Sequence, residues 1–452
     1  MFPPAARPLF CLRILATLGL ALCGFSCSEV HPKAARPTPA APPLASVITP
    51  RAETRVFPVM LGIDVLEADG FAAVRGKRIG LLTHPAGVNR RGVSTIDILR
   101  RATGVKLVAL YGVEHGIDGS ISASRNYQDS VHPGTGLPIF SLYNGKSRKP
   151  TPTQLKGIDA LVIDLQDIGT RSYTFVSAMK VCLEACFENN KEVIILDRPN
   201  PLGGLKVDGP PLDADLMSYV GAFRVPYVHG LTIGELAIVA KNTPGVLSVP
   251  ESVRTKGRLT VIAMKGWHRS MRWPEPGLTF VPTSPYVRNF GAAAGYAMTG
   301  LGCEIGGFQH GVGTGYPFRT LSFPKRSPEE LKRALDALRL PGVSFSVIGT
   351  VDSNGKPMRG VYTEITDWNA WRPTELSLHM MQLAAAWSPR NPFAAASTTD
   401  ADLFRKHTGS RALWQALVRD GAKTNVAALH EQWRQRALAY QQQTRRFWLY
   451  QP

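Results

Sequence analysis

The chain has 452 residues, of which 52 are Lys or Arg and 34 are Asp or Glu, and its formal net charge is +18. A domain usually takes roughly 100–200 residues, so this length predicts two or three domains, each large enough to bury a hydrophobic core. Hydrophobic residues make up 44% and charged residues 19% of the chain, which excludes a wholly disordered chain, a collagen-like repeat and a polytopic membrane protein. The excess of positive charge predicts attraction to anionic partners without naming one of them.

Residues 1–28 are expected to be a secretory signal peptide. Two arginines precede the apolar run Ile14–Phe25, which is too short to span a bilayer comfortably and is typical of the apolar region of such a signal. A helical membrane anchor is the alternative. Cys27 lies in an imperfect lipoprotein motif, so we expect export to the periplasm or cell envelope, with or without a lipid anchor on Cys27. Residues 29–57, rich in Pro and Ala, are expected to form an extended tether.

Short apolar runs alternate with helical patterns from residue 58 to about residue 240. Near-continuous apolar runs suit strands that are covered on both faces, as in a parallel sheet. Helices are expected between them, over Thr95–Ala102 and Tyr173–Asn189. This alternation predicts an α/β fold, with a Rossmann-like, doubly wound parallel sheet domain over residues 58–240. The four expected strands are Ile79–Leu82, Leu107–Leu110, Leu161–Ile163 and Val193–Leu196.

Each of these strands is followed at its carboxyl end by polar, titratable residues. Ligands of doubly wound sheets bind outside the carboxyl ends of the strands, so this edge of the sheet is the predicted site. No single residue of the set is decisive, because an Asp after a strand is often a turn former or the N-cap of a helix. The residues are Thr83, His84, Glu114, His115, Asp164, Gln166, Asp167, Asp197 and Arg198.

Residues 241–452 are expected to form a smaller α+β domain. Strands are predicted at Leu259–Met264 and Val343–Ile348, separated by the Gly- and Pro-rich section Gly266–Pro324. A connection of that length without regular structure is usually functional. Helices are predicted at Ser327–Leu338, with Ser327 as its cap, and at Glu375–Trp387, Ser410–Arg419 and Asn425–Arg446.

Several common functional motifs are absent from the sequence. There is no phosphate-binding loop of the G-x-x-x-x-G-K-[ST] type and no G-x-S-x-G nucleophile elbow. The glycine-rich run Gly311–Gly315 does not open a helix after a strand, so no dinucleotide or other cofactor is predicted. The His and Asp residues lack the local spacing of a structural metal site, and a catalytic metal assembled from several loops is the alternative. Nucleic-acid binding is not expected, because no motif of interleaved aromatic and basic residues is present.

The remaining acids and histidines, with glycines beside them, fit the hydrolysis of a glycosidic bond. That reaction needs a carboxylic acid to protonate the leaving oxygen and a second group that acts as base, nucleophile or charge stabiliser. Glu114 lies in a glycine-flanked loop beside His115 and suits the first role. The alternative is a structural carboxylate that pairs with Arg125 or Arg171.

Five blocks of sequence, taken in order, resemble the motifs of the NamZ-type exo-β-N-acetylmuramidases, and the resemblance runs from about Gly62 to Tyr450. Leu110–Gly119 is similar to the family's L-F-G-P-E-H-G-x-x-G, and Asp164–Phe175 is similar to its D-I-Q-D-V-G-A-R-F-Y-T-Y. The other three blocks are Thr135–Tyr143, Leu196–Gly204 and His229–Ala237.

The resemblance implies an exported hydrolase that releases terminal N-acetylmuramic acid from the non-reducing ends of peptidoglycan fragments, without a cofactor. It implies a Rossmann-like domain and a C-terminal α/β domain, with the active site in the cleft between them. Peptidoglycan fragments or muramic-acid saccharides are the implied partners, and an anionic envelope surface is a further expected contact. Catalysis is assigned to Glu114 as general acid, with His115 and Asp164. The implied substrate-binding residues are Thr83, His84, Gln166, Asp167, Arg171, Tyr173, Asp197, Arg198, Asn200, His229, Glu304 and His310.

One block departs from the family pattern. Where the family has a run resembling E-G-T-N-x-S-E-G-R-G-T, this chain reads Glu304–Thr314. His310 replaces the second Glu, Val312 replaces the Arg, and Gly307 replaces the Asn. A neutral His310 near its ordinary pKa would still serve as a base. The altered loop motivates a second hypothesis, in which a catalytically altered relative acts as a glycan-binding protein of the cell envelope.

Overall fold

The computed structural model describes residues 59–452, which belong to one compact unit. The predicted signal peptide, the tether, Cys27 and the alternative of a membrane anchor all concern residues outside the described ones. Among residues 59–452, none of the helices combines the length and the apolar character that crossing a bilayer requires.

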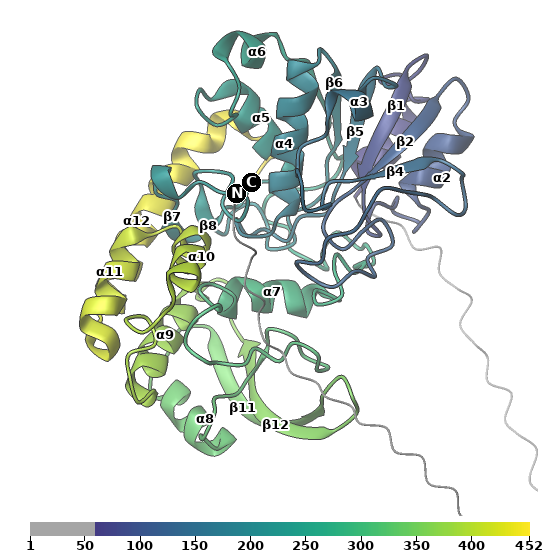
Figure 1. Ribbon diagram of the computed structural model, residues 1–452. Helices are drawn as coiled ribbons and strands as arrows, with labels where there is room; N and C mark the ends of the chain where they lie inside the picture. Colours follow the sequence, from purple (N-terminus) through teal and green to yellow (C-terminus); the bar gives the residue numbers. More distant parts are fainter. Residues whose placement is uncertain (1–58) are drawn as a thin grey trace, which may run out of the picture. The chain divides into compact units, whose positions relative to one another are not determined.

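The first half of the described chain is built on a seven-stranded sheet with the strand order β3-β4-β2-β1-β5-β6-β9 (Figure 1). Neighbouring strands run parallel except β3, which is antiparallel to β4. β1 has β2 on one side and β5 on the other, so the order of strands reverses there. The crevice at the carboxyl ends of such strands is where doubly wound sheets bind ligands. The strands are β1 (Arg78–Thr83), β2 (Lys106–Gly112), β3 (Ser130–Val131), β4 (Pro138–Ser141), β5 (Ala160–Asp164), β6 (Glu192–Leu196) and β9 (Leu259–Ile262).

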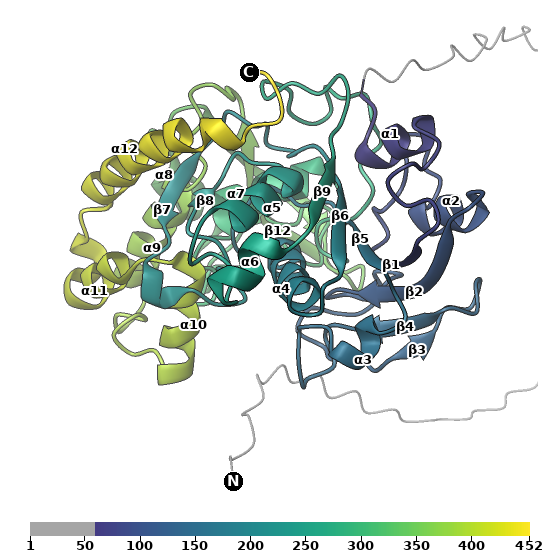
Figure 2. The same ribbon diagram turned by 90° about the horizontal axis from the view of Figure 1, so that it is seen from above.

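Helices cover both faces of this sheet (Figure 2). On one face α1 and α2 share a core with Leu81 and Val162, and on the other face α4 and α5 share a core with Leu161 and Ile163. Successive side chains of a strand point to opposite faces, so both kinds of position are buried and the strands are apolar throughout. This arrangement confirms the predicted Rossmann-like domain. The helices are α1 (Gly62–Ala68), α2 (Thr95–Arg101), α4 (Phe175–Glu188) and α5 (Ile233–Asn242), with the short helices α3 (Pro152–Leu155) and α6 (Glu251–Lys256).

The strand β9 belongs to this sheet, although the sequence pattern placed it in the second domain. It pairs in parallel with β6, from Val193 opposite Leu259 to Leu196 opposite Ile262. Parallel neighbours need a crossover connection that is usually helical, and α5 and α6 supply it here. The change of pattern after Asn242 therefore marks the end of a helix in this crossover, and the sheet continues beyond it.

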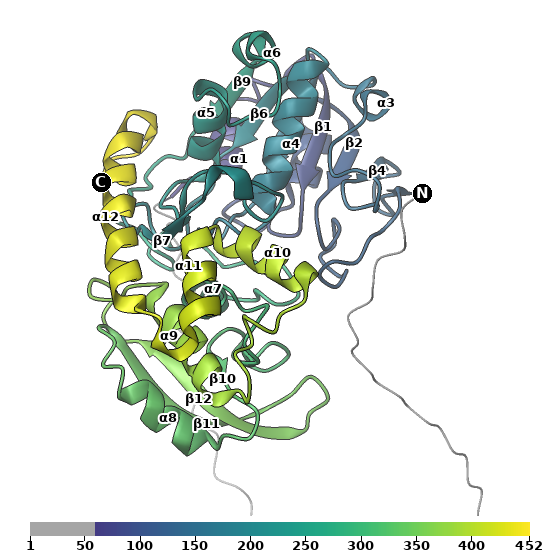
Figure 3. The ribbon, with the colours of Figure 1, turned by 60° about the vertical axis from the view of Figure 1, so that its left-hand side comes forward.

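The second half of the chain forms a smaller α+β part (Figure 3). Its sheet has three antiparallel strands in the order β10-β12-β11, and α8 lies against β11 and β12. A separate core joins α7, α9 and α12 through Met298, Met381 and Trp433. The hairpin of β7 and β8 lies beside α12. The elements are β7 (Asp208–Pro211), β8 (Pro226–Val228), α7 (Phe290–Thr299), β10 (Thr320–Leu321), α8 (Pro328–Asp336), β11 (Val343–Val351), β12 (Pro357–Ile365), α9 (Glu375–Trp387), α10 (Thr398–Thr408), α11 (Arg411–Asp420) and α12 (Val426–Thr444).

The helix α7 lies inside the section Gly266–Pro324, which was expected to have no regular structure. Its residues are mostly Ala, Gly and other apolar types, so it lacks the alternating polar and apolar faces that mark a surface helix. Most of the helix is buried, and Asn289 caps its first turn by accepting a backbone hydrogen bond. The absence of a polar face is the reason why the sequence pattern missed this helix.

Candidate active site

The carboxyl ends of three neighbouring strands meet at one edge of the sheet. Thr83, the last residue of β1, lies opposite Gly112 of β2 and Asp164 of β5. The buried Thr83 hydroxyl donates a hydrogen bond to Asp164 O at 3.2 Å and joins two of the strand ends. The loops that carry the predicted polar residues therefore leave the sheet side by side, as expected for a parallel sheet.

Glu114 follows β2 after one residue, and its side chain is half-buried. Its Oε1 accepts a hydrogen bond from Ser124 N and its Oε2 accepts one from the Thr174 hydroxyl, both at 2.8 Å. Thr174 is the N-cap residue of α4, but its hydroxyl does not cap the helix, because it is turned towards Glu114. Within residues 59–452 Glu114 forms no ion pair, so the alternative in which it pairs with Arg125 or Arg171 is wrong.

His115 has a left-handed backbone conformation, with φ at 75°. That region costs a residue other than Gly about 1–2 kcal/mol, and strain of this kind is often found at functional sites. The turn is closed by a hydrogen bond from Gly116 N to Val113 O at 3.1 Å. The ring Nδ1–H donates to Ile121 O at 2.7 Å, so the unprotonated ring nitrogen is Nε2. Nε2 has no hydrogen-bond partner in the described chain, and the ring edge faces Tyr286 at 6.3 Å between centroids.

Tyr173 connects the loop after β5 with a distant segment of the chain. Its hydroxyl donates a hydrogen bond to the Thr283 hydroxyl at 2.7 Å. Burial raises the pKa of Tyr173, and the negative charges of Asp167 and Glu114 add to that rise. Tyr173 is therefore a neutral phenol that lies within electrostatic reach of both carboxylates.

Asp167 and His229 form a buried pair close to Tyr173. His229 Nε2 donates to Asp167 Oδ2 at 3.1 Å, and this choice of tautomer follows from Leu231 N, which donates to His229 Nδ1 at 3.1 Å. Both side chains are almost wholly buried, and Asp167 Oδ1 is enclosed without a hydrogen-bond partner. An unpaired buried carboxylate oxygen costs free energy. The pair does not face solvent. The negative charge of Asp167 acts on the neighbouring Tyr173.

His84 and Gln166 are buried between the loops after β1, β5 and β6. Gln166 N donates to His84 Nε2 at 2.9 Å, and the Gln166 side-chain amide donates to Pro199 O at 2.8 Å. Burial lowers the pKa of His84 well below its ordinary value, and the positive charge of Arg198 lowers it further. The neutral imidazole and the amide thus hold three loops together.

Four more of the predicted residues are buried beside the carboxyl ends of the strands, namely Asp164, Asp197, Arg198 and Asn200. The fully buried carboxylate of Asp164 forms an ion pair with Arg198 and accepts a hydrogen bond from the Thr95 hydroxyl. Asp197 and Asn200 are buried as well, and their oxygens accept hydrogen bonds from backbone N–H groups. Burial raises the pKa of Asp197 to about 6. Oxygens that are enclosed and paired in this way are not available to a substrate.

Arg171 is buried on the side of the site that faces the second half of the chain. Its guanidinium donates to Pro210 O at 2.6 Å, to Val225 O at 2.8 Å and to Thr408 O at 2.7 Å. Burial lowers the pKa of Arg171 to about 10. Because both terminal nitrogens are engaged with carbonyl groups, Arg171 joins the β7–β8 hairpin to the end of α10.

The altered block Glu304–Thr314 follows α7. Glu304 Oε1 lies 2.6 Å from His407 Nδ1, and His310 Nδ1 is enclosed without a partner. Burial lowers the pKa of His310 to about 4. A histidine with that pKa is a much weaker base than one near pH 6.5, so the expectation of a base near its ordinary pKa is wrong. In the described chain neither Glu304 nor His310 forms a hydrogen bond or ion pair with Glu114.

Two cavities open beside this edge of the sheet. One, of about 660 Å³, is lined by His84, Gly116 and His132 among other residues. The other, of about 200 Å³, is lined by Gln166 and Arg198 among others. Cavities of several hundred Å³ suit small ligands such as a sugar. Among residues 59–452, no group of three or more His, Cys, Asp or Glu side chains is arranged to hold a metal ion.

The sequence reasoning missed three residues that surround Glu114 and Tyr173. Thr174 belongs to the block Asp164–Phe175, and its place beside Tyr173 was a signal that pointed to it. Ser124 contributes only its backbone N–H, and Thr283 comes from a distant loop. Neither of these two has a sequence pattern that distinguishes it from other Ser and Thr residues.

Known proteins resemble this chain over most of its length. Residues 79–291 match the family model of the N-terminal part of exo-β-N-acetylmuramidase NamZ, and residues 294–450 match the model of its C-terminal part. The peptidoglycan β-N-acetylmuramidase NamZ of Bacillus subtilis strain 168 is 38% identical over 328 residues, which are 72% of this chain and 77% of that protein.

Two solved structures of DUF1343 family proteins from Bacteroides fragilis NCTC 9343 have the same fold. One is 36% identical with a TM-score of 0.78, and the match covers 88% of this chain and all of that chain. The other is 25% identical with a TM-score of 0.67, over 87% of this chain and 99% of that chain. Both halves of the described chain thus match one family in sequence and in fold. The chain therefore belongs to the NamZ family of exo-β-N-acetylmuramidases and is a glycoside hydrolase of that kind.

Proposed function

We propose that this protein is exported and removes terminal N-acetylmuramic acid from the non-reducing ends of peptidoglycan fragments, with Glu114 as general acid. The name of the Bacillus subtilis relative supports this class of substrate. The observation that carries the proposal is the setting of Glu114. It is a half-buried carboxylate at the carboxyl ends of the strands, both of its oxygens are held by neutral donors, and it forms no ion pair in the described chain.

The geometry around Glu114 suits the protonation of a leaving group. The C1–O bond of the terminal sugar breaks as positive charge develops on its ring, and the leaving oxygen needs a proton. Glu114, in its carboxylic acid form, donates that proton. Hydrogen bonds from Ser124 N and the Thr174 hydroxyl then stabilise the carboxylate that remains. Because these donors are already in place, they need no reorganisation during the reaction.

His115 is our proposal for the second group. In the neutral ring Nε2 is the nitrogen that can accept a proton, because Nδ1–H donates to Ile121 O. Nε2 takes a proton from water as the water oxygen bonds to C1, while Glu114 gives its proton to the departing alcohol. One proton is lost and one gained, and exchange with solvent restores both groups. We assign no contact with substrate to Asp164, Asp197 or Arg171.

Export rests on the leader sequence, which the described residues do not include. Fractionation of cells that express the full chain, followed by mass analysis of the mature N-terminus, tests the proposal. We expect the protein in the envelope fraction, cleaved close to Cys27. A Cys27→Ser variant distinguishes lipid anchoring, because only a lipid-anchored protein would leave the membrane fraction on this change. Recovery of the uncleaved chain in the cytoplasm would contradict export.

The reaction is tested with a chromogenic β-N-acetylmuramide and the matching N-acetylglucosaminide. We expect release only from the muramide, and we expect Glu114→Gln to lower kcat by about 10²–10⁴-fold. Glu188→Gln, which changes an exposed carboxylate paired with Lys149, is the matched control. His115→Asn keeps a residue type that tolerates the left-handed conformation and should also lower kcat.

Two outcomes would count against the proposal. Full activity of Glu114→Gln would show that Glu114 takes no part in the reaction. A folded wild-type protein that binds muramic-acid saccharides but releases nothing would instead support the second hypothesis, a glycan-binding protein of the cell envelope.

A further inference from the structure

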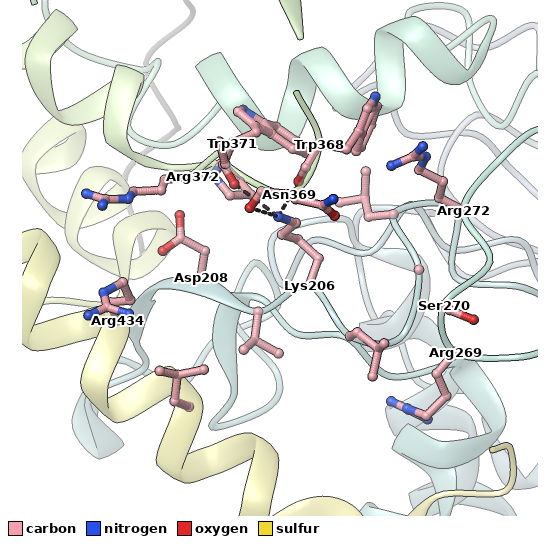
Figure 4. A pocket seen from close by; sticks show the side chains of 17 residues that line it. Lys206, Asp208, Arg269, Ser270, Arg272, Trp368, Asn369, Trp371, Arg372 and Arg434 are labelled. Atoms are coloured by element: carbon pink, nitrogen blue, oxygen red, sulfur yellow. Dashed lines mark hydrogen bonds between the residues drawn. The ribbon is translucent and has the colours of Figure 1, made fainter. Parts of the chain in front are cut away.

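A third cavity, of about 600 Å³, does not include Glu114 in its wall. Figure 4 shows the residues that line it. Four separate segments line it: residues 202–208 between β6 and β7, residues 269–272 after β9, residues 368–373 before α9, and the face of α12 with Arg434 and Leu438. None of the residues placed around Glu114 belongs to its wall. We call this feature the α12 groove.

The floor of the α12 groove is apolar and partly exposed. Leu205 and Leu438 are 43% and 42% exposed, which is unusual for leucines that lie together in one hollow. Trp368 stacks on Phe290, with 5.4 Å between ring centroids and 17° between ring planes. Lys206 Nζ donates to Trp368 O at 2.5 Å and to Trp371 O at 3.1 Å. The indole is therefore fixed by contacts on both its ring and its backbone.

Four arginines line the groove, of which Arg269 is buried and paired with Glu235. The other three lie around the floor. Figure 4 shows Arg372 and Arg434 at one end of the groove and Arg272 at the other, with Trp368 on the side of Arg272. The guanidinium of Arg272 lies 5.0 Å from the centre of the Trp368 ring. The groove thus combines an apolar, aromatic floor with guanidinium groups at both ends.

Each of these arginines has a carboxylate partner, which a ligand carboxylate would displace. Asp208, the acid in the groove wall, already accepts hydrogen bonds from Thr374 N at 2.8 Å and from His430 Nε2 at 3.1 Å. Arg272, Arg372 and Arg434 are each paired with a Glu three residues away along the chain, and these carboxylates lie outside the wall. The Arg272–Glu275 pair is exposed on both sides, and exposed pairs contribute little free energy. Arg434 binds Glu431 with two hydrogen bonds, and Glu375, the partner of Arg372, is 16% exposed. A guanidinium can exchange such a partner for the carboxylate of a ligand, which it binds with two parallel hydrogen bonds.

We propose that the α12 groove is a second, non-catalytic glycan-binding site that takes a carboxylate-bearing, N-acetylated segment of a peptidoglycan strand. The proposal rests on the proposed function. The apolar faces of sugar rings and the acetyl methyl groups pack on Trp368 and the two leucines. Carboxylates spaced along the strand meet Arg272 at one end and Arg372 and Arg434 at the other. The carboxylate comes from the stem peptide or from the lactyl group, which is free where the peptide has been removed.

The double variant Arg272→Gln with Arg434→Gln tests the groove. Arg419→Gln with Arg436→Gln is the matched control, because it removes the same charge from exposed positions on α11 and α12 that do not line the groove. Binding is measured by co-sedimentation with insoluble peptidoglycan in a Glu114→Gln background, which prevents digestion. Turnover of the chromogenic muramide is measured separately in the Glu114 protein. Equal melting temperatures establish that all variants are folded.

The expected result is an apparent Kd about tenfold weaker for the groove variant, with kcat/KM on the small substrate within twofold of wild type. The control should match wild type in both assays. Loss of binding only with intact peptidoglycan assigns the stem-peptide carboxylate, and loss only with peptide-free strands assigns the lactyl carboxylate. Equal weakening in both double variants, or no weakening in either, overturns the proposal. If the wild-type protein were inactive on the small substrate but still bound peptidoglycan through the groove, the proposed function would be refuted and the proposed binding site would stand.

Discussion

Arg171 can be used to test whether a residue of the family motif contacts the substrate or stabilises the fold. The motif implies contact with substrate, whereas the hydrogen bonds of Arg171 indicate a structural role. The guanidinium donates to the carbonyl groups of Pro210, Val225 and Thr408 at 2.6–2.8 Å, and the side chain is 1% exposed. Arg171→Met keeps the length and much of the volume of the side chain but removes every donor. Three buried carbonyl groups would then lose their partners.

The size of the effect follows from these contacts. A hydrogen bond from a charged group is worth about 1.5–3 kcal/mol, and the variant no longer has to desolvate the guanidinium. The net loss of stability is therefore about 3–5 kcal/mol, because each of the three carbonyl groups left unpaired costs about 1–3 kcal/mol. The entropy of unfolding is about 2.1 cal/mol/K per residue, or about 0.8 kcal/mol/K for a chain of about 390 residues. The expected fall in melting temperature is thus about 4–6 °C.

The measurement pairs thermal melting with steady-state kinetics on the chromogenic muramide, recorded well below the melting temperature. Arg171→Met should melt early and keep the wild-type KM. Arg419→Met is the control, since that side chain is 73% exposed and its pair with Asp420 is on the surface. A variant that melts like wild type but has a KM raised tenfold or more would show that Arg171 contacts the substrate, and would refute the structural assignment.

Three further predictions follow from other contacts. Thr174→Val removes the hydroxyl that donates a hydrogen bond to Glu114. One hydrogen bond to a charged group is worth about a tenfold to hundredfold change in rate, so kcat should fall by that factor without a change in melting temperature. An unchanged kcat would contradict this role. Burial opposes charge on His430 and on Asp208 and is the largest single influence on each, but hydrogen bonds and charge attraction together outweigh it, raising the pKa of His430 and lowering the pKa of Asp208. The pair stabilises the fold above the unfolded pKa of Asp, near pH 4, and this effect is lost as the pH rises through the folded pKa of His430. His430→Gln should therefore lower the melting temperature more at pH 5 than at pH 9. Gly62→Ala places a Cβ 2.4 Å from a backbone nitrogen just after β6; α1 must move, and urea unfolding should show a loss of about 1–3 kcal/mol, whereas wild-type stability would refute the close contact.

The edge of the sheet that carries the candidate site was predictable, but the role of each residue on it was not. Asp164, Arg171 and Tyr173 belong to one motif of twelve residues. In the structure Asp164 is enclosed by Arg198, Arg171 is enclosed by carbonyl groups, and Tyr173 lies close to Glu114. A motif records which residue types are present, and it does not record how deeply each one is buried.

Local patterns were sufficient where the physical cause is local. The continuous apolar run of β5, the helix Glu375–Trp387 and the cap of α8 by Ser327 were all predicted and are all present. Each depends on side chains a few positions apart, which determine burial on both faces of a strand, helical periodicity or the pairing of a cap with the first turn. The shared edge of the strand ends follows from the same patterns, because parallel strands joined by helices bring their carboxyl ends together.

Contacts between distant segments could not be read from spacing, and they determine the chemistry of this protein. Arg171 reaches Thr408, 237 positions away, and Tyr173 reaches Thr283, 110 positions away. β9 joins the first sheet after a crossover, and the α12 groove draws its wall from four separate segments. Such contacts depend on how complete elements pack against one another. Sequence spacing therefore placed Glu114 on the correct edge, while its partners, the burial of its neighbours and the groove arise from packing.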